Sequence, residues 1–102
     1  MEKIIHEAPG VAEAFFNMTR AIKSYSRMDE KVNELILVGI FTAHGAMRGL
    51  LTHIERALSH GAVKEEIFSS ILLALPVVGV TTTNLAMETA TQFFKDRKSE
   101  NC

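Results

Sequence analysis

The apolar positions of this chain recur with the period of an α-helix, and the pattern is clearest from Ala43 to Gly61. One face of this central stretch is apolar and comprises Met47, Leu50, Leu51, Ile54, Leu58 and Gly61. Beside it runs a stripe of small residues that contains one histidine: Ala46, Gly49, His53 and Ala57. Side chains this small leave room beside His53 for a neighbouring backbone or a ligand. Gly61 can take the left-handed conformation that closes a helix, so the helix is expected to end there.

Helices are also predicted on both sides of this central one. Val11–Tyr25 repeats apolar residues at helical spacing, and Ser24–Arg27 is expected to break it. Met28–Ala43 begins with Asp29 and Glu30, which suit a helix N-terminus. From Leu35 this helix is apolar almost all round, which indicates burial on every side.

The C-terminal part is predicted to hold two more helices. Ala62–Val78 contains Pro76, which removes a backbone donor and is expected to kink or end the helix. Val80–Arg97 is expected to be capped by Thr81-Thr82-Thr83-Asn84. Met1–Gly10 is expected to be a short tail closed by Pro9-Gly10, and Ser99–Cys102 is expected to fray. Since no stretch alternates as a strand does, the fold is predicted to be all-α, with about five helices in one domain spanning residues 1–102 and a core of about 11–97.

Composition adds an expectation about assembly. The chain has 102 residues, of which 47% are hydrophobic, and its mean hydropathy is +0.12. A domain near the lower size limit for a self-sufficient core cannot easily hide so much apolar surface, so a homo-oligomer is expected.

The charge and cysteine content limit the kinds of binding partner and the cellular compartment that are expected for this chain. The 11 basic and 12 acidic residues are interspersed, so neither nucleic acid nor an anionic membrane surface is expected as a partner. The longest apolar runs, Leu35–Phe41 and Ile71–Val80, are too short to span a bilayer. The N-terminus lacks the pattern of a signal peptide, and the single cysteine, Cys102, allows no intrachain disulfide; a cytoplasmic location is therefore expected.

His53 is the first candidate for chemistry, because imidazole, with a reference pKa of roughly 6.5, exchanges protons near neutral pH. A partly buried histidine that is retained for structure or subunit contact is the alternative. Arg48 is a candidate contact for a substrate anion, although such arginines more often lie on a solvated or intersubunit face. His44 is a candidate for the same cavity or a loop residue. The histidines are not spaced as metal ligands, so no metal and no cofactor are expected.

Several segments, taken in order, resemble the carboxymuconolactone decarboxylase family, which includes the alkylhydroperoxidase D-like proteins. They are Glu34-Leu35-Ile36 at the start of a buried stretch, His53-x3-Ala57-x3-Gly61, Glu65/Glu66-Ile67, and a Leu-Leu-x-Leu-Pro run. The resemblance covers about Val11 to Phe94. It implies a compact all-α bundle of alkylhydroperoxidase D-like type and assembly into hexamers or trimers, of which the hexamer is preferred here.

The resemblance also bears on the chemistry. The peroxidase branch of the family uses a Cys-x-x-Cys, a histidine four residues later and a glutamate on the preceding helix. The glutamate and histidine match Glu34 and His53, whereas Ala46 and Gly49 stand in the two cysteine positions. Reduction of a peroxide by a dithiol needs a thiolate and a resolving partner. Peroxidase activity is therefore the least favoured function.

Two other functions stay open from the sequence. In the first, the chain is a decarboxylase-like lyase for a small organic acid or lactone, with His53 as acid/base, Glu34 as its orienting partner, and Arg48 and His44 near the substrate. In the second, the chain is a non-catalytic homo-oligomeric relative in which the His53–Glu34 pair is structural.

Overall fold

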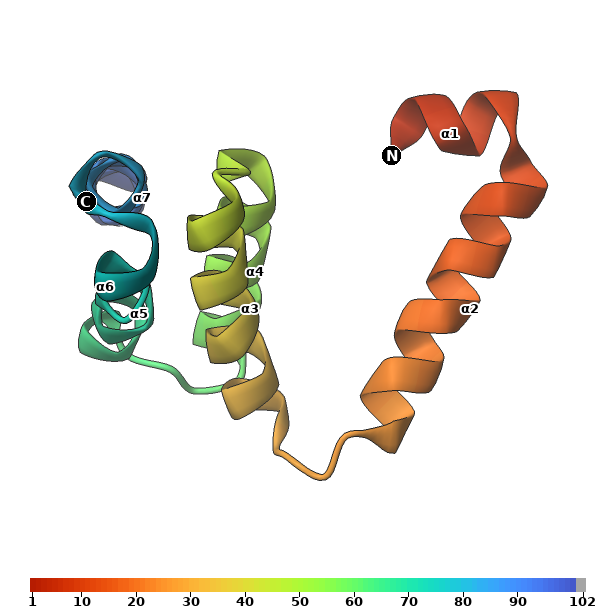
Figure 1. Cartoon of the computed structure of the whole chain (residues 1–102), viewed down its shortest axis with the longest axis horizontal. Coiled ribbons are helices and arrows are strands. Elements are labelled where there is room, and N and C mark those ends of the chain that lie inside the picture. The colour runs from red at the N-terminus through yellow and green to blue at the C-terminus, as the bar shows by residue number, and fades with distance from the viewer. Residues whose placement is uncertain (101–102) are drawn as a thin grey trace.

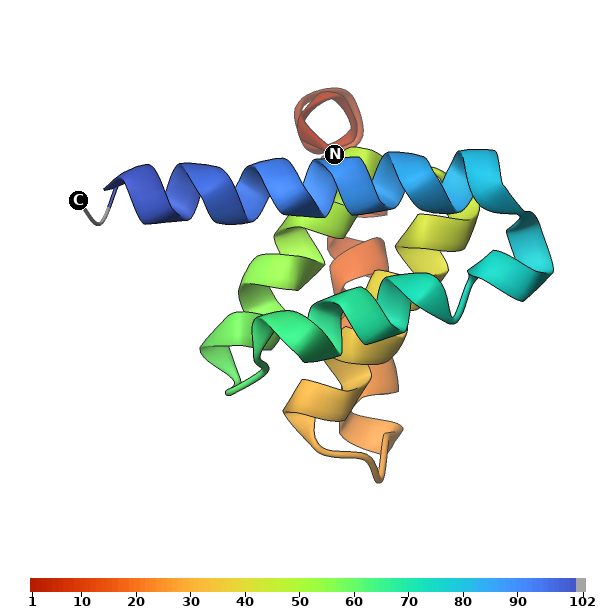
Figure 2. The same ribbon diagram turned by 90° about the vertical axis from the view of Figure 1, so that its left-hand side faces the viewer.

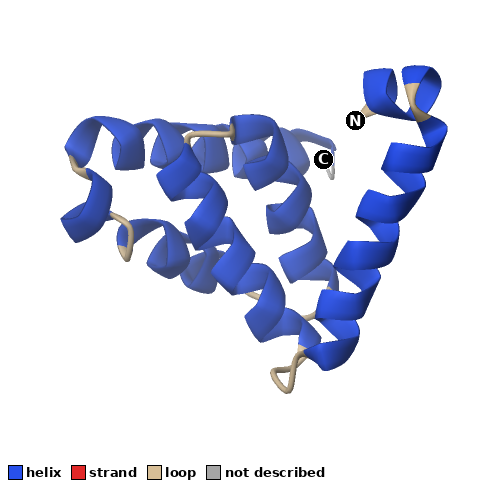
Figure 3. Ribbon diagram, turned by 45° about the vertical axis from the view of Figure 1, so that its right-hand side comes forward, coloured by secondary structure: helices blue, strands red, loops and turns tan. Residues whose placement is uncertain are grey.

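The computed structural model describes residues 1–100, and in this range helices are joined by short loops without any strand (Figure 3). The predicted all-α fold is confirmed. The helices are α1 (Glu2–Glu7), α2 (Pro9–Tyr25), α3 (Glu30–His44), α4 (Met47–Ser59), α5 (Lys64–Leu72), α6 (Leu75–Val78) and α7 (Val80–Glu100). Within the described residues, no helix is both long enough and apolar enough to cross a membrane.

The ends of α3 and α4 follow the local signals in the sequence. Asp29 caps α3, with its side chain accepting a hydrogen bond from the Val32 N–H at 2.9 Å. Gly45 follows α3 with a φ of 79°, and Gly61 follows the end of α4 with a φ of 95°. Both glycines take the left-handed conformation that lets the chain leave a helix sharply. The predicted closure at Gly61 is confirmed.

Pro76 acts as predicted, by interrupting the helical segment that contains it. α5 ends at Leu72, and the short α6 starts at Leu75 with Pro76 in its first turn. A proline is tolerated there because the backbone N–H of that position has no partner inside the helix. Gly79, with a φ of 89°, then separates α6 from α7.

Three local predictions are wrong. The expected tail forms the helix α1, and Pro9 opens α2 rather than closing a tail, because its fixed φ suits the first helical turn. The run Thr81-Thr82-Thr83-Asn84 lies inside α7, which already begins at Val80, so these residues do not cap it. The helix starts at Val80 as predicted, but Gly79, with its positive φ, makes the break that the threonines were expected to make. Of the segment Ser99–Cys102 that was expected to fray, Ser99 and Glu100 belong to α7, and residues 101–102 lie outside the described range.

The core lies where α3 and α4 pack against α5 and α7. Its largest fully buried side chains are Val38, Leu50, Ile54, Ile67 and Ile71, with Ala86 and Ala90 of α7 completing it. Figure 2 shows α7 crossing both α3 and α4. The small alanines let α7 approach closely.

α2 stands apart from this core. In Figure 1 it diverges from the α3–α4 pair on the side opposite α5 and α7, and its extended packing is against α1. Of the expected core of about residues 11–97, the part before Glu30 contributes one buried residue, Ala12. The amphipathic pattern of Val11–Tyr25 is therefore helical as predicted, but its apolar stripe is exposed in a single chain.

Candidate active site

His53 and Glu34 come from adjacent helices and meet between them. Gly45 turns the chain after α3 so that α4 packs along it. His53 Nδ1 lies 2.5 Å from Glu34 Oε2. Only 2% of Glu34 is exposed, and a carboxylate buried this deeply must be paired or hydrogen-bonded. The two residues that the sequence singles out as a pair are in contact.

The contact fixes the orientation of the imidazole ring. Glu34, as a carboxylate, accepts the hydrogen bond, so the proton of the neutral ring lies on Nδ1 of His53. Nε2 is then the free nitrogen, and among residues 1–98 no hydrogen bond to it is found. A carboxylate that holds one ring nitrogen leaves the other to exchange protons, as in catalytic His–carboxylate pairs. The His53 side chain is 14% exposed, so its edge reaches solvent.

The space beside His53 is filled by Phe41, an aromatic residue of α3. The two rings stack with centroids 4.9 Å apart and planes 17° apart. Gly49 makes this possible, because a Cβ at this position would overlap the Phe41 ring. The room predicted beside the stripe of small residues thus receives a side chain of the same protein. Phe41 was not a candidate from the sequence, because it is the last residue of a uniformly apolar run. The available signal was Gly49 on the facing helix, since a missing side chain there leaves space for a ring.

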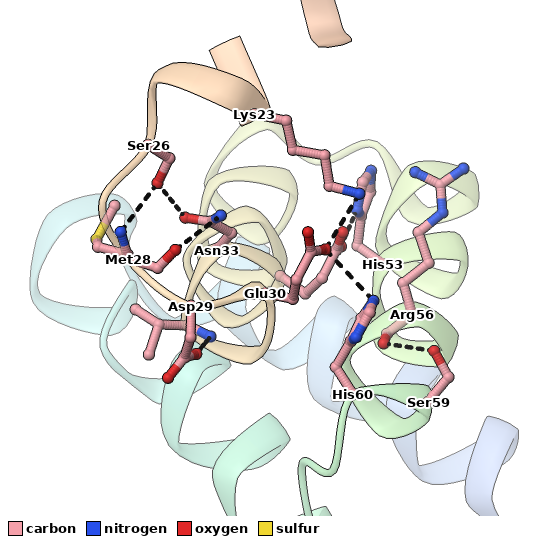
Figure 4. Close-up of polar contacts among 12 residues, drawn as sticks. Lys23, Ser26, Met28, Asp29, Glu30, Asn33, His53, Arg56, Ser59 and His60 are labelled. Atoms are coloured by element: carbon pink, nitrogen blue, oxygen red, sulfur yellow. Dashed lines mark hydrogen bonds and ion pairs between the residues drawn. The ribbon is translucent and has the colours of Figure 1, made fainter. Parts of the chain in front are cut away.

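A second, outer pair repeats this arrangement near the start of α3. Glu30 Oε2 lies 3.4 Å from His60 Nε2 and 3.1 Å from Lys23 Nζ, the latter at the end of α2. Figure 4 shows Lys23, Glu30, His53 and His60 on one side of the α3–α4 pair. The outer ion pairs are about half exposed, so each contributes at most about 1 kcal/mol.

The remaining candidates are not gathered around His53. His44 and Arg48 are exposed, and neither side chain hydrogen-bonds to His53 or Glu34. Two open hollows of about 430 and 510 Å³ lie along α4 and α7, and neither is lined by His53 or Glu34. Arg56, together with Arg97, lines the smaller one. The imidazole is therefore positioned by Glu34 and Phe41, and neither of these two hollows opens onto it.

The two positions that would hold thiols in the peroxidase branch are occupied by Ala46, just before α4, and by Gly49 in its first turn. A cysteine at position 49 would carry its Cβ into the Phe41 ring. Local packing as well as residue identity therefore departs from a dithiol site. Cys102 lies outside the described residues.

These features define an all-helical protein in which a buried glutamate and a partly exposed histidine pair between the two central helices. A comparison with family models assigns the chain to a family. The model of the carboxymuconolactone decarboxylase family matches residues 9–92, and the chain belongs to that family. The match begins at the first residue of α2 and ends within α7. No curated protein matches the chain.

Proposed function

We propose that the protein is a decarboxylase-like enzyme that performs acid/base chemistry on a small organic acid or lactone through His53. The observation that carries this proposal is the 2.5 Å contact between His53 Nδ1 and the buried Glu34. The pair aligns the ring and leaves Nε2 for proton exchange. Family membership supports the same class of chemistry.

Decarboxylation fits these groups because it requires no thiol. The bond to the carboxylate breaks, carbon dioxide leaves, and the electron pair stays on the adjacent carbon as an enolate-like anion. Protonated His53 delivers the proton of Nε2 to that carbon and recovers a proton from water. A cation must hold the substrate carboxylate, and Arg48 and His44, in the first turn of α4 and the last turn of α3, are proposed for substrate contact.

A non-catalytic oligomeric relative is the second candidate. It is favoured by the stacking of His53 on Phe41 and by the position of both hollows away from the pair. In that case the contact between His53 and Glu34 only holds α3 against α4, and substitutions of His53 should act on stability or assembly. A peroxidase function has the least support, since Ala46 and Gly49 replace both thiols.

The test is a screen of small carboxylic acids and lactones for carbon dioxide release, followed by the variant His53→Gln on any substrate found. We expect kcat/KM to fall by roughly 10²–10⁴-fold, as is usual when a general acid is removed, while the melting temperature and assembled mass stay close to those of the wild type. Glu34→Gln should reduce kcat less, because the amide oxygen of the new side chain can still accept the hydrogen bond that orients the ring.

The matched control is His60→Gln, which removes an α4 histidine that pairs with an exposed glutamate of α3. It should leave turnover unchanged. If His53→Gln instead lowers stability or breaks the assembly while any turnover persists, the structural role is correct and the catalytic one is wrong. Robust dithiol-dependent peroxide turnover by the wild type would overturn the argument from the missing thiols.

A further inference from the structure

The α1–α2 segment, residues 1–25, is called the arm below, and it carries an apolar stripe that its own chain does not cover. Val11, Phe15, Met18 and Ile22 follow one another at helical spacing and share one face of α2. They are 63%, 43%, 51% and 60% exposed. An isolated amphipathic helix of this length is only marginally stable in water, so the stripe is expected to pack against another surface.

The exit of the arm from the rest of the chain is fixed at its base. Lys23 bonds to Glu30, and Ser26 Oγ lies 2.8 Å from Asn33 Oδ1. Ser26 Oγ also accepts a hydrogen bond from the backbone N–H of Met28 at 3.2 Å. These contacts involve the first turns of α3, so they identify the side of α3 that is turned toward the arm.

That side of α3 carries two apolar residues, Leu37 and Ile40, of which Leu37 is half-buried and Ile40 exposed. Asn33, Leu37, Ile40 and His44 lie at helical spacing along it, and Ile40 is 56% exposed. His53 belongs to the same side of the α3–α4 pair, beside Lys23 and Glu30 (Figure 4). Each chain therefore presents an apolar helix that is not covered and an apolar face, Leu37 and Ile40, that is only partly covered within the chain.

The exposed area of the arm matches a complete protein interface. Nine large apolar side chains of residues 1–25 are between 37% and 82% exposed: Met1, Ile4, Ile5, Val11, Phe15, Phe16, Met18, Ile22 and Tyr25. With roughly 150–200 Å² for each such side chain, the arm offers on the order of 800 Å², which is what one partner contributes to an interface of standard size.

Charge argues that the partner is protein rather than lipid. The arm holds three basic and three acidic residues (Lys3, Arg20, Lys23; Glu2, Glu7, Glu13), so it has no excess of cations to attract an anionic membrane. A second copy of this chain supplies an apolar helix and an apolar face in equal numbers. A two-fold arrangement then buries both arms and both faces at once.

We propose that two copies of this chain exchange their arms, so that the apolar stripe of α2 of each copy packs on the side of α3 that carries Leu37 and Ile40 in the other. The exchanged helix covers the open edge of His53 and shields the His53–Glu34 pair from solvent. The assembly does not depend on the chemistry of the pair; only its effect on turnover rests on the function proposed above.

The first experiment measures the assembled mass of the full chain by sedimentation and light scattering. The wild type is expected to form a dimer or an even-numbered assembly such as a hexamer. The double variant Met18→Glu/Ile22→Glu should form a smaller unit, with the dissociation constant of the arm interface raised by roughly 100-fold or more, because two central apolar contacts are replaced by charges.

The matched control is Asn17→Glu/Ser24→Glu, which adds the same charge to the polar side of the same helix and should leave the mass unchanged. Far-UV circular dichroism checks that the core of α3, α4, α5 and α7 still folds in each variant, and the arm variant should lose at most the helix signal of α1 and α2, which lie outside that core. A wild type that is monomeric at all concentrations, or trimeric, overturns the reciprocal exchange. A monomer that floats with anionic vesicles shows that lipid is the partner and overturns it as well.

A third variant separates the arm–face contact from a simple pairing of two arms. Ile40→Glu alters the receiving face and leaves the arm intact, so arm exchange predicts that it also lowers the mass. If Ile40→Glu keeps the full mass while Met18→Glu/Ile22→Glu does not, the arms pair with each other and the proposal is wrong.

A second experiment tests, without any substrate, whether the exchanged arm covers His53. Carbethoxylation of His53, followed by mass spectrometry, should be slow in the wild type and several-fold faster in Met18→Glu/Ile22→Glu, with Asn17→Glu/Ser24→Glu as slow as the wild type. Equal His53 reactivity in all three proteins would overturn the coverage of the pair. Because this readout needs no turnover, it is independent of whether the proposed decarboxylation fails.

Discussion

Gly49 is the residue whose missing side chain allows Phe41 to stack on His53, and its replacement sets two known effects against each other. Alanine in a helix interior is more favourable than glycine by about 1 kcal/mol. The added Cβ overlaps the Phe41 ring, however, and forcing an extra methyl group into a packed site costs about 1–3 kcal/mol. Gly49→Ala should therefore lower the free energy of unfolding by up to about 2 kcal/mol, measured by urea denaturation.

The same substitution should change sign when the ring is removed. In a Phe41→Ala background the overlap is gone, so Gly49→Ala should stabilise by about 0.5–1 kcal/mol through helix propensity alone. Gly10→Ala, where an added Cβ meets nothing within 4 Å, serves as the control with open space. An identical effect of Gly49→Ala in both backgrounds would show that Phe41 is not what the glycine accommodates.

The Glu34–His53 pair and the Phe41 ring that stacks on it differ in how far the sequence could predict them. Glu34 and His53 were paired through a family resemblance, and their meeting is a contact in the structure. Phe41 could not be assigned, because in a run that is apolar all round no residue is distinguished by periodicity. Which of several equivalent apolar side chains meets a given histidine depends on the crossing of α3 and α4, which a single sequence does not specify.

At the scale of the helix, Glu66 links the start of α5 to α3 and should make the stability of the fold depend on pH. Its Oε1 accepts a hydrogen bond from the Val63 backbone N–H at 3.0 Å, and its Oε2 lies 3.0 Å from Lys31 of α3. The Val63 hydrogen bond, followed by the one from Lys31, lowers the pKa of Glu66 below its ordinary value of 4.5. Val63 itself has no side-chain acceptor, so Glu66 supplies the polar contact at the start of α5.

The sign of the effect follows from linkage. A carboxyl group with a lower pKa in the folded state stabilises that state above the unfolded pKa, and the contribution is lost as pH falls through the folded pKa. Wild type should therefore be more stable than Glu66→Gln at neutral pH, with the difference disappearing below pH 4.5. Urea midpoints across this range measure it, with Glu65→Gln as a control that removes the same charge from a neighbouring exposed residue. A gap that is independent of pH would contradict the assignment.

Element boundaries were predictable where one residue has a strong backbone preference. Asp29, Gly61 and Pro76 each acted as their chemistry indicates. The failures came where several residues compete. Thr81–Asn84 can cap a helix or lie inside one, and the glycine that precedes Val80 settled the start of α7 instead. α1 has only six residues, too few to show a helical period.

At the scale of the whole molecule, the chain consists of a packed unit and an arm. α3, α4, α5 and α7 share one core, whereas α2 contributes only Ala12 to the buried set. Composition indicated a surplus of apolar surface, but it could not say which helix would carry it. An amphipathic helix has the same sequence pattern whether the surface that covers it lies in its own chain or in another. The divergence of α2 from the core could therefore be seen only in the tertiary structure.

This division predicts an uneven distribution of stability, which hydrogen exchange with mass spectrometry can measure. Amides of α4 and α5 should open only with unfolding of the core, because Leu50, Ile54, Ile67 and Ile71 are fully buried. In the arm variant Met18→Glu/Ile22→Glu, α2 should exchange quickly, since a helix of 17 residues without tertiary packing is marginal in water. In the wild type, α2 should gain protection as protein concentration rises, because the surface that covers it belongs to another copy. Strong protection of α2 in the variant, equal to that of α4, would mean that the arm packs on its own chain and that the surplus apolar surface lies elsewhere.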